Sequence, residues 1–190
     1  MIGLLGGSFD PIHHGHLIVA RTLLEALGLE QVRFVPAREQ PFKIGRHAAP
    51  AAARARMVGL AIAGEPRFVL EPLELERPGP SYTVDTLRAL RAREPDREFA
   101  LLVGADAARD LPNWHQAEAL AGLATLVVFA RPGVAVPPLP WPSRTVPVPG
   151  VEISATGVRA RVAAGLPIRY WVPDPVAGFI SANGLYLADA

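Results

Sequence analysis

Residues 6–16 read Gly6-Gly7-Ser8-Phe9-Asp10-Pro11-Ile12-His13-His14-Gly15-His16, and they follow the short apolar run Ile2–Leu5. Apolar residues at helical spacing come next, so the segment is expected to turn from a buried strand into a helix. Glycines permit a tight turn and let a ligand approach the backbone closely. Exposed N–H groups at a helix start favour an anion, and His13 and His16, three residues apart, share a helical face. The pattern predicts a phosphate-binding turn in which Gly15 leaves room beside the histidines.

Other interpretations of these residues remain open at this stage. The histidines could cap the helix or point to solvent, and the glycines could serve the turn alone. A metal site would need an aspartate, because the other histidines are His47 and His115 and the chain has no cysteine. The segment contains neither G-x-G-x-x-G nor Gly-Lys-Ser/Thr, so it is neither the dinucleotide fingerprint nor a P-loop.

A second candidate phosphate site lies near the carboxyl end, at Ile153-Ser154-Ala155-Thr156-Gly157-Val158-Arg159. Ser154 is a favourable N-cap for a helix, and Thr156 can support the same turn. Arg159 can lean back toward the helix start, as helical side chains do. The segment therefore predicts a second anion site, although a capped surface helix with an ordinary arginine would look the same.

Strands and helices are predicted to alternate along the chain. The predicted strands or extended segments are Ile2–Leu5, Gln31–Pro36, Phe68–Leu75, Phe99–Val103, Thr125–Ala130 and, after a proline-rich connection, Arg144–Val148. The predicted helices are His16–Leu27, Ala51–Ala63, a helix capped by Ser81 that runs to Arg93, Trp114–Leu120, Ser154–Ala164 and Pro175–Ala182.

This order predicts an α/β fold, namely a Rossmann-like doubly wound parallel sheet with helices on both faces and a small C-terminal helical part. Ligands of such sheets bind beyond the carboxyl ends of the strands. The length of 190 residues predicts a single domain, 1–190, in which about residues 150–190 form a C-terminal helical subregion with the second motif.

The composition limits the classes of partner. A net charge of +1 argues against general capture of nucleic acid or of an anionic membrane, so phosphate must be bound by a few placed groups. No apolar run is long enough to span a bilayer, and the lack of cysteine excludes disulfides and thiolate chemistry. We expect a cytoplasmic protein without nucleic-acid or membrane partners, and the sequence leaves a homo-oligomer open. Lys43 is the only lysine, which draws attention to its loop.

The two motifs together resemble signatures of the nucleotidyltransferase superfamily. Residues 6–16 are similar to the long form of H-x-G-H, and residues 153–159 are similar to I-S-x-T-x-I/V-R, which the superfamily uses to grip the β- and γ-phosphates of ATP. The resemblance implies that His13 and His16 are catalytic. It also implies a set of ATP-binding residues: Gly7, Ser8, Phe9, Ile153, Ser154 and Arg159.

Three intermediate segments resemble the bacterial nicotinate mononucleotide adenylyltransferases within that superfamily. These segments are Pro80–Leu87, Gly104–Asp106 followed by Leu111–Trp114, and Phe129–Gly133. The resemblance implies a nicotinate pocket lined by Tyr82, Thr83 and Trp114, and further ATP contacts at Gly104 and Asp106. It also implies phosphate contacts from Lys43 to ATP and from Arg131 to the acceptor. From the residues alone, Tyr82 and Trp114 could equally be packing residues, Asp106 a turn residue, and Lys43 and Arg131 solvated cations.

Phe42 stands where that family commonly has histidine, so no histidine role passes to it. The resemblance implies adenylyl transfer from the co-substrate ATP to nicotinate mononucleotide, with Mg²⁺ bound through the phosphates and no metal ligands from the protein. Nicotinamide mononucleotide or another phosphorylated acceptor is the alternative substrate. A non-catalytic nucleotide-binding sensor is the alternative of a different class.

Overall fold

The computed structural model describes residues 1–39 and 48–188, so Lys43 and His47 lie outside the described residues. The strands are β1 (Ile2–Gly7), β2 (Gln31–Pro36), β3 (Phe68–Leu70), β4 (Phe99–Gly104), β5 (Thr125–Ala130) and β6 (Ser143–Pro147). They pair in parallel in the order β3-β2-β1-β4-β5-β6. The predicted doubly wound α/β sheet is confirmed.

The strand order reverses direction at β1. From β1 the chain first builds outward through β2 and β3, and then it returns to place β4 on the other side of β1. Ile2 is therefore in register with Gln31 on one side and with Phe99 on the other. A crevice opens beyond the carboxyl ends of the strands at such a reversal, which is where ligands of doubly wound sheets bind.

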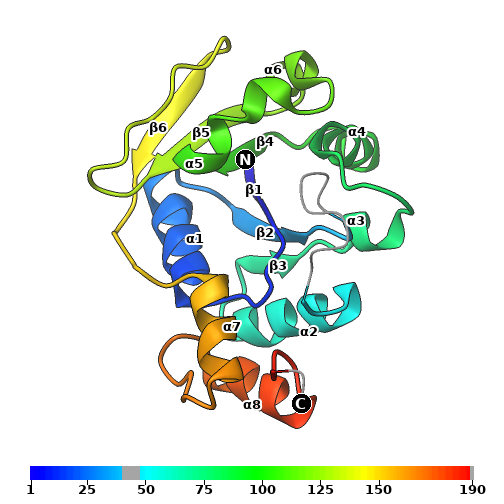
Figure 1. The fold of residues 1–190 in the computed structure, drawn as a ribbon. Coiled ribbons are helices and arrows are strands. Elements are labelled where there is room, and N and C mark those ends of the chain that lie inside the picture. Colours follow the sequence, from blue (N-terminus) through cyan, green and yellow to red (C-terminus); the bar gives the residue numbers. More distant parts are fainter. Residues whose placement is uncertain (40–47, 189–190) are drawn as a thin grey trace.

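Helices cover both faces of the sheet (Figure 1). They are α1 (His14–Ala26), α2 (Ala51–Ile62), α3 (Leu73–Glu76), α4 (Thr83–Arg93), α5 (Ala105–Ala108), α6 (Leu120–Leu123), α7 (Ala155–Ala163) and α8 (Asp174–Ala182). The first face carries α1 and α2, with α7 and α8 added to that side after β6; the second face carries α4, α5 and α6. The C-terminal helices pack on the first face because α8 contacts α2. In the described chain, no helix combines the length and apolar character needed to cross a membrane.

The central strands bury both of their faces, and alternate residues supply two separate cores. Leu4 and Leu101 point to the core under α4, whereas Leu5 and Leu102 point to the core under α1. This arrangement explains why these strands are nearly continuous apolar runs in the sequence instead of alternating ones.

The segment between β3 and α4 differs from its prediction. Phe68–Leu75 was predicted to be extended, but only Phe68–Leu70 forms a strand, and a short helix follows Pro72. Ser81 was predicted to cap α4 but lies one residue before the N-cap residue, which is Tyr82. The hydroxyl oxygen of Ser81 instead accepts the N–H of Arg38 (3.0 Å). The hydroxyl of Ser81, on which the capping prediction depended, is therefore hydrogen-bonded to a residue distant in the chain.

The predicted helix Trp114–Leu120 is also wrong. The chain forms short 3₁₀ turns at Leu111–Asn113 and Ala117–Ala119, and α6 begins only at Leu120. Gln116 has a left-handed backbone conformation (φ 49°), which interrupts a right-handed helix. The interruption leaves Trp114 at the end of the first turn, where its ring faces the cavity described below.

The packing of α1 against the sheet contributes to the stability of the first face. Leu23 is fully buried there, so Leu23→Ala should lower the free energy of unfolding by about 2–5 kcal/mol through lost burial and a residual cavity. Ile18→Ala is the matched control, because Ile18 lies on the same helix and is exposed; it should cost under about 1 kcal/mol. Urea unfolding followed by circular dichroism measures both, and equal losses would contradict this packing.

Candidate active site

Two cavities open side by side at the carboxyl ends of β1 and β4. The histidine cavity, of about 350 Å³, is lined by residues that include His13, His16, Ser154 and Asp106. The aromatic cavity, of about 380 Å³, is lined by residues that include Tyr82, Thr83 and Trp114. They adjoin because Leu5, Gly104 and Phe129 line both.

The start of α1 holds the two imidazoles against each other. His13 is the N-cap residue, and its backbone N–H donates to Nδ1 of His16 (3.2 Å). The two rings stack with their centroids 3.8 Å apart. Because Nδ1 of His16 is an acceptor, the proton of the neutral ring is on Nε2, which makes Nε2 a donor. Nδ1 of His13 is buried and has no hydrogen-bond partner among the described residues.

Burial keeps both imidazoles neutral near pH 7. It lowers the pKa of His13 from 6.5 to about 4, with a further lowering by the nearby His14. Burial likewise lowers the pKa of His16 well below 6.5, and His13 adds to that effect. In the free protein the two imidazoles therefore offer hydrogen bonds without a full positive charge.

The start of α7 meets the start of α1 across the histidine cavity. Gly15 sits at the contact: a Cβ there would lie 3.0 Å from Nδ1 of His13 and 3.6 Å from the carbonyl oxygen of Ile153. Glycine at this position therefore allows His13 to pack against the first turn. Ser154 caps α7 as predicted, because its Oγ accepts the N–H of Gly157 (3.1 Å). Two helix starts, each with N–H groups that favour an anion, thus lie at one cavity.

Arg159 joins the two motifs directly. Its guanidinium donates to the carbonyl oxygen of Asp10 (2.7 Å) and to Oγ1 of Thr156 (3.2 Å). It is therefore attached to the turn that follows β1, although 149 residues separate it from Asp10. Arg159 is not among the described residues that line the histidine cavity, and neither is Asp10, whose carbonyl oxygen it binds.

The far side of the histidine cavity is formed at the ends of β4 and β5. Gly104 lies against the ring of Phe129, which a Cβ would approach to 3.3 Å. Asp106, on α5, is exposed, and its carboxylate lies 3.8 Å from the guanidinium of Arg131. Arg131 was assigned to the acceptor phosphate, and the structure places it in the histidine cavity beside Asp106. Asp106 and Arg131 are the permanently charged side chains among the described residues of this cavity.

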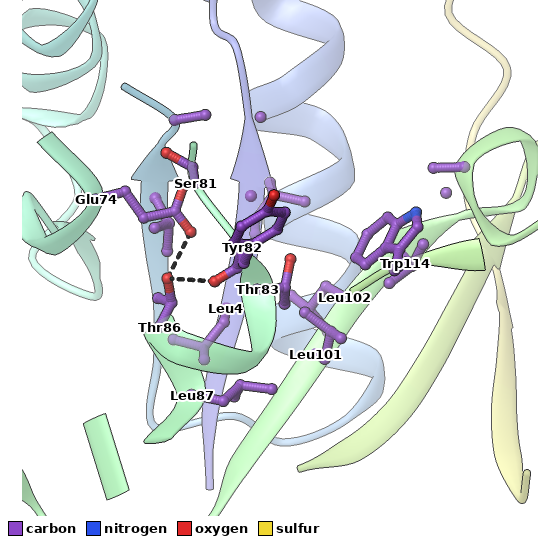
Figure 2. Close-up of a pocket in the computed structure, with 18 of the residues that line it drawn as sticks. Leu4, Glu74, Ser81, Tyr82, Thr83, Thr86, Leu87, Leu101, Leu102 and Trp114 are labelled. Carbon is purple, nitrogen blue, oxygen red and sulfur yellow. Dashed lines mark hydrogen bonds between the residues drawn. The ribbon is translucent and has the colours of Figure 1, made fainter. Parts of the chain in front are cut away.

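The aromatic cavity combines an apolar floor with two aromatic rings. Leucine and valine side chains from β1 and β4 form much of its lining, and Tyr82, Thr83 and Trp114 stand at its side (Figure 2). The ring of Tyr82 packs on that of His115, with centroids 4.4 Å apart. A flat apolar ligand would find rings to stack on, while the N-terminus of α4 offers backbone donors to an anionic group.

A buried carboxyl group fixes the start of α4. Oε1 of Glu74 accepts the hydroxyl of Thr86 (2.8 Å), as Figure 2 shows. Burial raises the pKa of Glu74, while hydrogen bonds from Thr86 and Ser81 and the charge of Arg77 lower it. These contacts hold the residues on both sides of Tyr82 and Thr83 and so fix this wall of the aromatic cavity.

Some predicted ATP residues have other positions. Gly7 lines the aromatic cavity. Ser8 and Phe9 are not among the described residues of either cavity. The ring of Phe9 is buried against His16 and Phe34, and its backbone is left-handed (φ 47°). Phe9 therefore supports His16 from the core side, while Lys43 lies outside the described residues.

Sequence reasoning missed the residues that hold the turn between β1 and α1. Arg54 is fully buried and donates to the carbonyl oxygens of Ser8 (2.6 Å), Arg38 (3.0 Å) and Ala49 (3.3 Å). One signal was available, because Arg54 lies on the apolar face of its helix, three and four residues before the buried Met57 and Val58. An arginine on such a face needs buried acceptors.

The described residues do not form a dedicated metal site. In residues 1–39 and 48–188, no group of three or more His, Asp and Glu side chains is placed to hold a metal ion. The carboxylate of Asp106 is the one hard anionic ligand among the described residues of the histidine cavity.

Comparison with known proteins places these features in a family. A sequence model described as cytidylyltransferase-like matches residues 4–161. A protein of Thermus thermophilus named "Probable nicotinate-nucleotide adenylyltransferase" is 50% identical over 97% of this chain and 98% of its own length. A protein of the same name from Geobacillus thermodenitrificans is 48% identical over 97% of this chain and 85% of its own length.

The fold also matches a solved structure. The nicotinic acid mononucleotide adenylyltransferase of Plasmodium falciparum, complexed with NaAD, aligns with a TM-score of 0.79 over 97% of this chain and 96% of its own. The sequences are 20% identical, so this likeness concerns the fold.

The low pKa of His13 makes stability depend on pH. Between about 4 and 6.5 the unfolded chain binds a proton that the folded protein excludes, so the free energy of unfolding should fall as the pH is lowered through this window. The loss from this residue should be on the order of 3 kcal/mol. His13→Asn removes the titration of this residue and should make the slope between pH 7 and pH 4.5 in urea unfolding shallower, while the buried His16 keeps its own contribution. The same slope in both proteins would show that His13 is not held neutral by burial.

Proposed function

Because this chain belongs to the cytidylyltransferase-like family, and within it to the nicotinate-nucleotide adenylyltransferases, we propose that it transfers the adenylyl group of ATP to nicotinate mononucleotide. The products are nicotinate adenine dinucleotide and pyrophosphate, in the biosynthesis of NAD. The observation that carries this proposal is the meeting of two helix starts at one cavity, beside a second cavity lined by aromatic rings.

The reaction is a single in-line displacement. An oxygen of the acceptor's 5′-phosphate forms a bond to the α-phosphorus of ATP, and the bond from that phosphorus to the bridging oxygen of pyrophosphate breaks. Little covalent chemistry is needed from the protein, since positioning and stabilisation of charge supply the acceleration. The adjoining cavities fit this reaction because they share the wall at Gly104 and Phe129, where the two substrates meet.

The imidazoles act as neutral donors to the triphosphate. Nε2–H of His16 is oriented by the hydrogen bond at Nδ1, so it donates to an α-phosphate oxygen. The ring of His13 lines the same cavity and provides a second hydrogen bond to the triphosphate. An anion in the cavity favours the charged form of an imidazole, so binding of ATP raises the pKa of both rings and strengthens these hydrogen bonds.

The helix starts hold the leaving pyrophosphate. The N–H groups at the start of α7, oriented by the Ser154 cap, face the same cavity as His13. Arg159 fixes the relative position of the two motifs through Asp10. A Mg²⁺ ion bound with the nucleotide would be held mainly by phosphate oxygens, with Asp106 the one carboxylate among the described residues of the cavity, and it would supply neutralisation of the phosphate charge.

The aromatic cavity receives the pyridine ring. Trp114 and Tyr82 supply flat surfaces, and a cationic pyridinium ring adds a cation–π attraction. The start of α4 directs backbone donors toward the ring's carboxylate. Acid and amide differ at this one group, so the contacts around Thr83 decide between them.

Pyrophosphate release tests the function. The wild-type protein, ATP and Mg²⁺ should release pyrophosphate with nicotinate mononucleotide, and more slowly with nicotinamide mononucleotide. His16→Ala should lower kcat by at least about 100-fold, the usual cost of losing an oriented donor to the reacting phosphate. His14→Ala is the control, because His14 is not among the described residues of either cavity. Binding of ATP without release from any acceptor would identify a nucleotide-binding sensor.

Trp114→Ala tests the acceptor site separately. Loss of a stacking surface should raise KM for nicotinate mononucleotide about tenfold and leave KM for ATP within about twofold. Trp141→Ala is the matched control, because Trp141 is outside the described lining of both cavities. Steady-state kinetics with each substrate varied in turn measures both constants. A rise in KM for ATP alone would place the adenine, and not the pyridine, on Trp114.

A further inference from the structure

A buried carboxylate lies inside the turn that follows β1. Asp10 is 5% exposed. Its Oδ2 accepts the N–H of Ala48 (2.8 Å), and its Oδ1 accepts the N–H of Ala49 (3.1 Å) and the hydroxyl of Tyr186 (2.7 Å). The carboxylate thus ties the turn to the residues before α2 and to the segment that follows the last helix.

The backbone of the same residue connects the two phosphate motifs. The carbonyl oxygen of Asp10 accepts the guanidinium of Arg159 (2.7 Å), and His13 follows three residues later. The neighbouring carbonyl of Ser8 accepts the buried guanidinium of Arg54. Burial lowers the pKa of Arg54, and the negative charge of Asp10 is the leading effect that raises it again. The orientation of Asp10 therefore affects both the histidine motif and the arginine of the second motif.

Tyr186 reaches Asp10 from 176 residues away in the chain. At the end of α8, the N–H of Leu185 donates back to the carbonyl of Ile180, and Gly184 adopts the left-handed conformation (φ 58°). Tyr186 is itself left-handed (φ 66°), which is strained for an aromatic residue and requires other contacts to hold it. Burial, together with the hydrogen bond to Asp10, raises the pKa of its hydroxyl, so the group remains a donor.

We propose that Tyr186 is a positioning residue of the adenylyl-transfer site and that it acts through the carboxylate of Asp10. Its hydroxyl fixes the rotation of the carboxylate, which fixes the backbone at Asp10 and therefore the carbonyl that holds Arg159. The ATP-binding half of the site then depends on the C-terminal segment. The aromatic cavity lies apart from these contacts, so the acceptor side does not depend on Tyr186. This inference rests on the proposed function.

Tyr186→Phe removes the hydroxyl alone and keeps the ring. Because two backbone N–H groups still hold Asp10, the variant should fold with a melting midpoint above the assay temperature. It should lower kcat about tenfold or more and raise KM for ATP, while KM for nicotinate mononucleotide stays within about twofold. Tyr170→Phe is the matched control: Tyr170 is also a left-handed tyrosine (φ 67°), but it is 76% exposed. It should match the wild type.

A double-variant cycle tests the route through Asp10. If Tyr186 acts through this carboxylate, then Tyr186→Phe should add little to the loss already caused by Asp10→Ala, which removes both carboxylate oxygens. Additive losses would overturn the proposal, as would wild-type kinetics or an unfolded protein in Tyr186→Phe.

Calorimetric binding of ATP should weaken in Tyr186→Phe, and unchanged ATP binding would also count against the proposal. An inactive wild type would instead overturn the proposed function, whereas an active wild type beside an equally active Tyr186→Phe would overturn only this inference.

Discussion

The structure depends on one contact, the meeting of the first turns of α1 and α7 above the carboxyl end of β1. The chain completes the whole sheet between these two helices, yet Gly15 lies against the carbonyl of Ile153, and Arg159 is bound to Asp10. Two sets of helix N–H groups then face one cavity. With a net charge of only +1, the protein has no general positive field, so this local convergence has to supply the attraction for phosphate.

Burial sets the charge state of the two histidines at this cavity. The imidazoles of His13 and His16 are neutral in the free protein because the surroundings exclude their charged forms. The turn is held from behind by Arg54, whose guanidinium makes its hydrogen bonds to backbone carbonyls. A site of this kind offers fixed donors and dipoles, and these need little rearrangement when charge shifts during the reaction.

The reversal of strand order produces two cavities of different chemistry. One is bounded by helix starts, two histidines and the Asp106–Arg131 pair, and the other by apolar strand residues and aromatic rings. The shared wall brings the cavity proposed for phosphate and the cavity proposed for a flat ring next to each other. To join two nucleotides, a protein has to hold the phosphates in one place and the ring in another, with both next to the atom that reacts.

The sequence by itself determined the α/β class, the bounds of β2 and β5, and the position of the two motifs that it predicts to bind phosphate. These features follow from local periodicity, glycine positions and capping chemistry, which act between residues close in the chain. The cap at Ser81 and the helix at Trp114–Leu120 were wrong because Arg38 takes the Ser81 hydroxyl and Gln116 adopts a left-handed backbone. Only the tertiary structure decided that Arg54 supports the turn and that Tyr186 reaches Asp10. Hydrogen bonds across such separations depend on how the helices pack, and that packing has no local signature in the chain.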